Sequence, residues 1–144
     1  MGGETRQFVE QNLKSWNAHD KTAWTRDISD DADVAAPGGV SGKGRELKAM
    51  FYAMWTDAFP DNKITPNVIA TDGENAMLEA TFEGTHTGPL NAPTGTIQPT
   101  RKRVKVPFVT VTKIRDGKFA SLHLYFDQVE LMSQLGLMPA PARA

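Results

Sequence analysis

The chain contains no cysteine among its 144 residues. This absence excludes a disulfide scaffold, a thiol nucleophile and a zinc site built from cysteine ligands. It is compatible with a reducing compartment, and we expect a cytoplasmic protein. The sequence also lacks the roughly 20-residue apolar run of a membrane helix. Its first residues lack the charged and apolar regions of a signal peptide.

An excess of charge of either sign is absent as well. Sixteen Lys and Arg residues face 17 Asp and Glu residues, giving a formal net charge of −1. We therefore expect no nucleic-acid partner and no membrane partner. The short basic run 101–105 has no interleaved aromatic residues, so we interpret it as a solvated strand end.

Common catalytic and phosphate-binding motifs are missing too. The sequence has no HExxH, no GxSxG and no two-histidine, one-carboxylate pattern, so we predict no metal site. The glycine-rich stretch 38–44 does not fit a phosphate-binding loop. Pro37 stands where that motif needs glycine, and Gly44 stands where it needs serine or threonine. We interpret this stretch as a loop before a helix.

The first half of the chain has a helical pattern. Forty per cent of the residues are hydrophobic, and 144 residues are enough for one domain with a sizeable core. We predict a single domain over 1–144 with a short flexible tail at 139–144. Apolar residues recur at helical spacing over 5–19, and Asp20 is a candidate N-cap for a short helix over 21–28. A third helix with a wide apolar face begins near Gly44 and ends before Pro60.

From residue 63 the apolar pattern changes to a period of two. We predict strands over 63–71, 75–87, 103–114 and 118–126, with an earlier short strand over 34–36. The segment 88–100 is predicted to be a long loop, and 128–135 a short closing helix that Gly136 ends. This order predicts an α+β fold in which the helices pack on one face of a curved antiparallel sheet.

The last predicted strand has one polar face and one apolar face. Alternation places Leu122, Leu124 and Phe126 on the apolar face. It places Phe119, Ser121, His123, Tyr125 and Asp127 on the other face. If the helices cover the polar face, that face lines a pocket and the apolar face is a subunit contact. If the helices cover the apolar face, the polar face is simply exposed to solvent.

Three polar residues are candidate catalytic groups, each with a structural alternative. Asp127 and Glu130 form a capping box for the last helix, so Asp127 is an N-cap or a catalytic carboxylate. His123 is a structural or a functional histidine. His86 has the parity of Leu78 and should face inward. We expect it at the mouth of a pocket or in a hydrogen bond that anchors the following loop.

Aromatic side chains gather on the predicted helices. Trp16, Trp24, Phe51 and Trp55 are either part of the core or the wall of a cavity. The sequence pattern alone does not separate these two possibilities.

Several short motifs, in this order and spacing, carry a resemblance to a known family. Residues 8–137 resemble the SnoaL-like polyketide cyclase family. The motifs are Trp16-Asn-Ala-His-Asp20, Gly42-Lys-Gly-Arg-Glu46, Ala58-Phe-Pro-Asp61, Gly84-Thr-His-Thr-Gly88, Arg115-Asp-Gly-Lys118, Tyr125-Phe-Asp127 and Gln134-Leu-Gly136.

The resemblance implies an NTF2-like fold, which is a cone of curved sheet closed by helices around an apolar pocket. It implies a homodimer through the convex sheet face, with Leu122, Leu124 and Phe126 at or near the contact. It also implies that a hydrophobic small molecule, most concretely a polyketide ester, closes a ring by intramolecular aldol condensation without cofactor or metal.

The resemblance places the acid/base at Asp127, and His123, Tyr125 or His86 would stabilise the enolate or protonate the product. The expected substrate-binding side chains are Tyr125, Trp16, Phe51, Trp55 and Phe82. Three alternatives stay open: a non-catalytic module that binds a hydrophobic ligand or a partner, another NTF2-like enzyme such as an isomerase or dehydratase, and a structural dimer with a filled cone.

Overall fold

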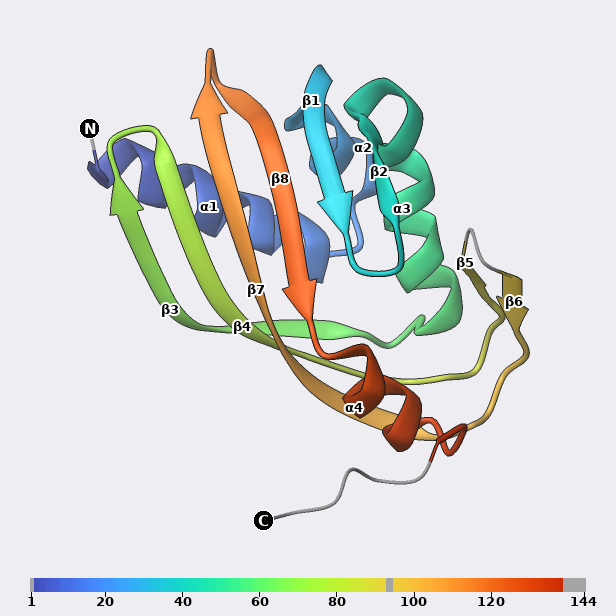
Figure 1. Cartoon of the computed structure of the whole chain (residues 1–144). Coiled ribbons are helices and arrows are strands. Elements are labelled where there is room, and N and C mark those ends of the chain that lie inside the picture. The colour runs from blue at the N-terminus through green and yellow to red at the C-terminus, as the bar shows by residue number, and fades with distance from the viewer. Residues whose placement is uncertain (1, 93–94, 139–144) are drawn as a thin grey trace.

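The helices lie where the apolar periodicity predicts them, with small shifts at their ends (Figure 1). The computed structural model describes residues 2–92 and 95–138, and the predicted tail lies outside these residues. Within them, the helices are α1 (Gly2–Asn17), α2 (Lys21–Arg26), α3 (Gly44–Ala58) and α4 (Gln128–Gln134). Asp20 is the N-cap of α2, as predicted, because its carboxylate accepts a 3.0 Å hydrogen bond from the backbone N–H of Ala23.

The strands form one curved sheet and one small hairpin. Their bounds are β1 (Ile28–Ala36), β2 (Val40–Lys43), β3 (Lys63–Asp72), β4 (Asn75–Thr85), β5 (Leu90–Ala92), β6 (Gly95–Ile97), β7 (Arg103–Arg115) and β8 (Lys118–Phe126). The strand order in the large sheet is β2-β1-β8-β7-β4-β3, and β5 pairs with β6. The prediction of a long loop over 88–100 is therefore wrong at residues 90–92 and 95–97.

The β1 strand pairs with β8 in parallel, whereas every other pairing in the sheet is antiparallel. We predicted only residues 34–36 of β1 and assigned β2 to a loop. The sequence of β1 does not show a strand pattern, because its exposed positions carry aspartate. The glycines near β2 are typical of a loop. Non-local pairing with β8 and β2 extends these segments.

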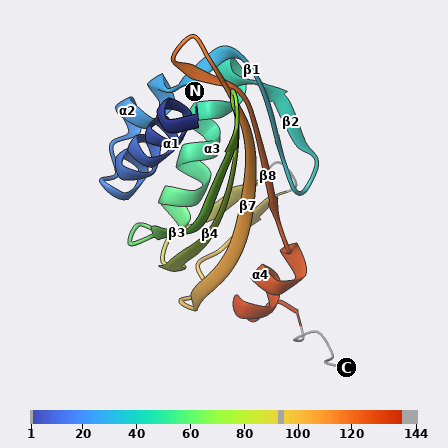
Figure 2. The ribbon, with the colours of Figure 1, turned by 90° about the vertical axis from the view of Figure 1, so that its left-hand side faces the viewer.

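The helices α1, α2 and α3 lie on the concave side of the sheet, and α4 lies at its end (Figures 1 and 2). The α3 helix begins directly against β1. A Cβ atom at Gly44 would lie 2.0 Å from the carbonyl oxygen of Ser29, so only glycine permits this close approach. Gln134 attaches α4 to β7, since its Oε1 accepts from the Lys105 N–H at 2.6 Å and its Nε2 donates to the Lys105 carbonyl at 3.0 Å.

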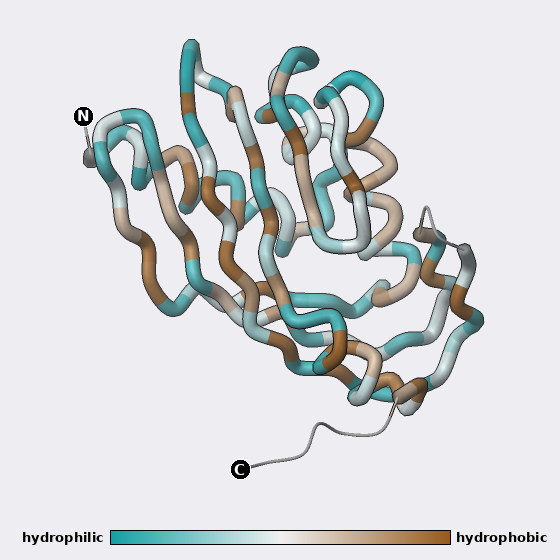
Figure 3. The backbone as a smooth tube through the Cα atoms, in the orientation of Figure 1, coloured by the Kyte–Doolittle hydropathy of each residue, from teal (hydrophilic) through white to brown (hydrophobic). Residues whose placement is uncertain are grey.

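Hydropathy alternates along the long strands, which gives the sheet one buried face and one exposed face (Figure 3). In β4, Ala76, Leu78, Ala80 and Phe82 are buried against the helices, as the sequence predicts.

The helices cover the apolar face of β8, so the placement of Leu122, Leu124 and Phe126 at a dimer contact was wrong. Leu122 and Leu124 are buried in the core, and Phe126 packs against it. The assignment of Phe119 to the polar face was also wrong. The pairing with β7 shifts its register between Lys113 and Ile114, and a β-bulge of this kind turns Phe119 to the inner face.

No helix in the described residues is both long enough and apolar enough to cross a membrane.

Candidate functional site

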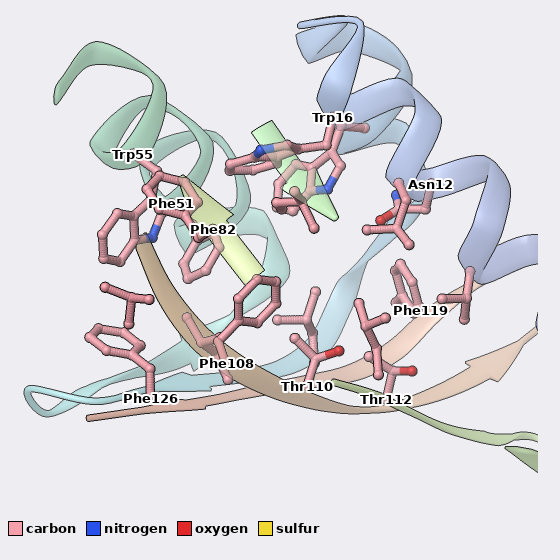
Figure 4. Close-up of a pocket in the computed structure, with 18 of the residues that line it drawn as sticks. Asn12, Trp16, Phe51, Trp55, Phe82, Phe108, Thr110, Thr112, Phe119 and Phe126 are labelled. Carbon is pink, nitrogen blue, oxygen red and sulfur yellow. The ribbon is translucent and has the colours of Figure 1, made fainter. Parts of the chain in front are cut away.

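A cavity of about 110 Å³ lies between the concave face of the sheet and the helices above it. Figure 4 shows its wall, to which α1, α2, α3, α4 and the strands β3, β4, β7 and β8 contribute side chains. Trp16, Phe51, Trp55 and Phe82 all line it, in agreement with their predicted positions. The cavity is therefore a space left by the packing of large aromatic and aliphatic residues.

The α3 helix places two aromatic rings one turn apart at the roof of the cavity. Residues four apart lie on one helix face, so Phe51 and Trp55 both point toward the sheet. The Trp55 ring meets the rings of Phe82 and Phe126 edge-on, each at a centroid distance of 5.6 Å. Phe51 stacks on Trp24 with the centroids 6.0 Å apart. Such pairs each contribute about 0.5–1.5 kcal/mol beyond area burial, which fixes the shape of the wall.

Few polar atoms face the cavity. Among residues 2–92 and 95–138, its lining includes Asn12, Thr110 and Thr112 but no Asp, Glu, His, Lys or Arg. Asn12 is buried and its Nδ2 donates to a carboxylate oxygen of Asp27 at 3.1 Å. The Thr112 hydroxyl donates to the carbonyl of Ala76 at 3.3 Å.

Two of the three tryptophans that line the cavity, Trp16 and Trp55, differ in their hydrogen bonding. The indole N–H of Trp16 donates to Oδ1 of Asn62 at 2.7 Å. The indole nitrogen of Trp55 is buried and has no hydrogen-bond partner among the described residues.

Asp127 lies outside the cavity wall. Its carboxylate is exposed and accepts hydrogen bonds from the backbone N–H groups of Val129 at 2.9 Å and Glu130 at 3.2 Å. It is the N-cap of α4, which confirms the capping prediction. The preceding residue, Phe126, lines the cavity, so the chain turns from the cavity to the outside within one residue.

His123 and Tyr125 lie on the outer face of the sheet and do not line the cavity. The Nε2 atom of His123 is 3.2 Å from a carboxylate oxygen of Asp33 on the neighbouring strand β1. Tyr125 is 55% exposed. The structure therefore does not bring these two residues together with Trp16 or Phe51, because the helices cover the other face of β8.

His86 is fully buried, so its predicted inward orientation is confirmed, but it does not line the cavity. Its Nδ1 atom accepts a 3.1 Å hydrogen bond from the backbone N–H of Thr100 and lies 3.0 Å from the Thr100 hydroxyl. This is the loop-anchoring contact. Burial lowers the pKa of the imidazole below its usual value, and the Gly88 backbone partly offsets this effect.

Sequence reasoning missed the polar side chains of the cavity. Asn12 lies one turn before Trp16 on α1. Thr110 and Thr112 share the inward parity of Val106 and Phe108 on β7. This alternation along β7 is the sequence signal from which Thr110 and Thr112 could have been predicted to line the cavity. In the described residues, no group of three or more His, Cys, Asp or Glu side chains is placed to hold a metal ion.

Known proteins provide independent information on this fold. The family model for SnoaL-like polyketide cyclase matches residues 6–135, which confirms the resemblance. No curated protein matches the chain.

Among solved structures, the chain is similar to a protein from Jannaschia sp. CCS1 that is assigned as a SnoaL-like polyketide cyclase. The TM-score is 0.83 at 20% identity, with 96% of each chain covered. It is similar to a protein with a ketosteroid isomerase-like fold from Catenulispora acidiphila (TM-score 0.73, 20% identity, 91% of this chain and 93% of that chain). It is also similar to an LEH-like epoxide hydrolase from M. tuberculosis (TM-score 0.70, 19% identity, 93% and 90%). The fold is therefore NTF2-like.

Proposed function

Because the chain belongs to the SnoaL-like polyketide cyclase family, we propose that it binds a hydrophobic small molecule in the cavity beneath α1 and α3. The observation that carries this proposal is the wall of the cavity, which is almost entirely aromatic and aliphatic. Ligand sites are typically concave and apolar, with a small number of placed polar groups. The three polar lining residues and the Trp55 indole fit that description.

A pair of neighbouring residues on β7 provides the test. Thr110 lines the cavity, whereas Val111 is exposed on the outer face of the same strand. We expect Thr110→Phe to fill the cavity and abolish the binding of a small apolar probe such as toluene. Val111→Phe adds similar bulk outside and should leave binding unchanged. Methyl NMR signals of Leu122 and Leu124 report on the probe. Equal binding by both variants would place the site elsewhere.

The second candidate is cofactor-free acid/base catalysis, most concretely ring closure of a polyketide ester by intramolecular aldol condensation with Asp127 as the base. Family membership and the position of Asp127 directly after Phe126 favour it. Its carboxylate would have to exchange the two N–H groups of α4 for the substrate. We expect Asp127→Asn to lower the rate of ring closure at least about 100-fold, since it removes a general base. Unchanged turnover in this variant would exclude Asp127 as the base.

The expected homodimer through the convex face of the sheet stays a proposal, with different residues at the contact. Tyr125, Met77 and Val111 are 55%, 53% and 37% exposed there. The ladder pairs Met77 with Val111, and Val111 with His123, so these side chains form a continuous row across the strands. Exposed apolar side chains in this row, on a sheet face that no helix covers, support a contact with a second copy of the chain.

A further inference from the structure

The indole N–H of Trp55 is a buried donor without an acceptor in the described residues. Trp55 lines the cavity, and Figure 4 shows its nitrogen on the ring edge that faces the space between α3 and the sheet. The edge-on rings of Phe82 and Phe126 offer at most a weak N–H···π contact. Buried indole N–H groups usually have a hydrogen-bond partner. A ligand in the cavity can supply the missing acceptor.

Three other donors of the cavity wall have internal partners. Trp16 donates to Asn62, Asn12 donates to Asp27, and the hydroxyl of Thr112 donates to the carbonyl of Ala76. The indole N–H of Trp55, by contrast, is buried and has no partner in the described residues, so a bound molecule can satisfy it without breaking an existing hydrogen bond.

The charge of the wall restricts what can bind. In the part of the chain that the structure describes, none of the lining residues is acidic, basic or a histidine. Burying an ionised group without a counter-charge is strongly unfavourable. A neutral molecule is therefore strongly preferred over an anion or a cation.

The size of the cavity restricts the ligand further. Its volume of about 110 Å³ is somewhat below the roughly 150 Å³ of an engineered apolar cavity that binds benzene. Space of this size accommodates one small ring.

Resting on the proposed binding function, we propose that the ligand is a neutral, single-ring molecule whose carbonyl or ether oxygen accepts a hydrogen bond from Nε1 of Trp55. Trp55 is then the residue that selects and orients the ligand. The apolar remainder of the wall supplies most of the affinity and little of the selectivity.

Three six-membered ring probes test this proposal. Cyclohexanone carries an acceptor, methylenecyclohexane has the same shape without one, and cyclohexanecarboxylate is an anion. We expect cyclohexanone to bind about three- to tenfold more tightly than methylenecyclohexane, the range of one net hydrogen bond. Cyclohexanecarboxylate should bind at least about tenfold more weakly than cyclohexanone. Only the ketone should move the indole N–H proton signal of Trp55 downfield.

Two tryptophan variants provide the matched comparison. Trp55→Phe keeps an aromatic ring and removes the donor, so the affinity ratio of the two neutral probes should fall to about one. Trp16→Phe removes an N–H that Asn62 already occupies, so the ratio should stay at its wild-type value. The chain has three tryptophans, so its indole N–H signals are readily resolved. If Trp55→Phe does not fold, the wild-type protein still tests the proposal: cyclohexanone should shift the indole N–H signal of Trp55, and methylenecyclohexane should not.

The outcomes separate this inference from the proposed function. Binding of both neutral probes with a ratio of one in the wild type overturns the role of Trp55 and leaves the cavity as a binding site. If Trp55→Phe keeps the wild-type affinity ratio of the two neutral probes, the role of Trp55 is likewise overturned and the cavity remains a binding site. Binding of cyclohexanecarboxylate as tightly as cyclohexanone overturns the preference for neutral molecules. Failure of every probe to bind overturns the proposed function and this inference with it.

Discussion

The indole N–H of Trp16 donates a hydrogen bond of 2.7 Å to the side-chain oxygen of Asn62, and both residues are buried. Trp16 lies on α1, and Asn62 lies in the turn between α3 and β3. Asn62 also donates through Nδ2 to the carbonyl of Phe59 at 2.8 Å. One amide side chain therefore ties the first helix to the end of the third helix and holds the roof of the cavity in place.

This relationship predicts a large stability effect at Asn62. Asn62→Ala leaves the N–H of Trp16 buried without an acceptor, so we expect a loss of about 2 kcal/mol in the free energy of unfolding. Asn67→Ala is the control, because the Asn67 side chain donates to Thr81 on the exposed surface at 3.1 Å. We expect that variant to lose no more than about 0.5 kcal/mol. Urea denaturation measures both. Similar losses would show that the buried bond is not important.

The N-cap of α4 predicts different effects for two substitutions at Asp127. Asp127→Ala removes the acceptor for two backbone N–H groups, and we expect a loss of about 1 kcal/mol in the free energy of unfolding. Asp127→Asn keeps an acceptor oxygen and should stay within a few tenths of a kcal/mol of the wild type. Urea denaturation of the wild type and the two variants measures these differences in the free energy of unfolding. Equal losses in both variants would contradict the prediction. Since we expect the asparagine variant to keep the stability of the wild type, its activity reports on catalysis alone.

Stability should fall in mild acid because of His86. Burial lowers the pKa of this histidine in the folded state below the usual value near 6.5. The unfolded chain therefore binds a proton that the folded chain resists, and the free energy of unfolding falls as pH drops through about 6.5. His86 alone changes the free energy of unfolding by at most about 1.4 kcal/mol per pH unit. Protonation at Nδ1 would also break the hydrogen bond from Thr100.

Denaturation from pH 8 to pH 5 measures this effect. His86→Asn should remove that part of the pH dependence, although it lowers stability at neutral pH. The control is His123→Asn, whose ring lies on the outer face beside Asp33. That variant should retain the contribution of His86. A wild-type profile that is unchanged by His86→Asn would contradict the prediction.

A charge on the outer sheet face should separate the proposed dimer. Val111→Lys introduces a cation into the row formed with Met77 and His123, so we expect a shift from dimer to monomer. Val129→Lys is the control, since Val129 is 44% exposed on α4. It should leave the mass unchanged. Sedimentation equilibrium gives the mass of each protein. A monomeric wild type at high concentration would exclude the dimer.

The elements of this fold were predictable where neighbouring residues decide them. Asp20 and Asp127 sit directly before helices, and their carboxylates reach backbone N–H groups two or three residues away. The alternation of Leu78, Ala80 and Phe82 in β4 requires only one buried face. Such patterns are local, so the sequence carries them without knowledge of the rest of the chain.

The cavity was predictable only in part. Trp16, Phe51, Trp55 and Phe82 follow helix and strand periods and were predicted to lie inside. The structure does not bring together the three candidate catalytic residues Asp127, His123 and His86. The sequence could not predict this, because the position of each residue depends on how distant segments pack. Alternation in β8 defines two faces but does not state which one the helices cover, and the bulge near Phe119 changes the phase within the strand.

The sequence by itself determined the helices, the long strands β3, β4, β7 and β8, the caps of α2 and α4 and the inward face of β4, since these follow from short-range geometry. The tertiary structure alone decided that Leu124 faces the cavity and His123 faces outward, because that depends on where α1 and α3 pack. It also decided that, within the described residues, the indole N–H of Trp16 has a hydrogen-bond partner and that of Trp55 has none. Whether a buried donor finds an acceptor depends on residues from distant segments, which come together only in the folded chain.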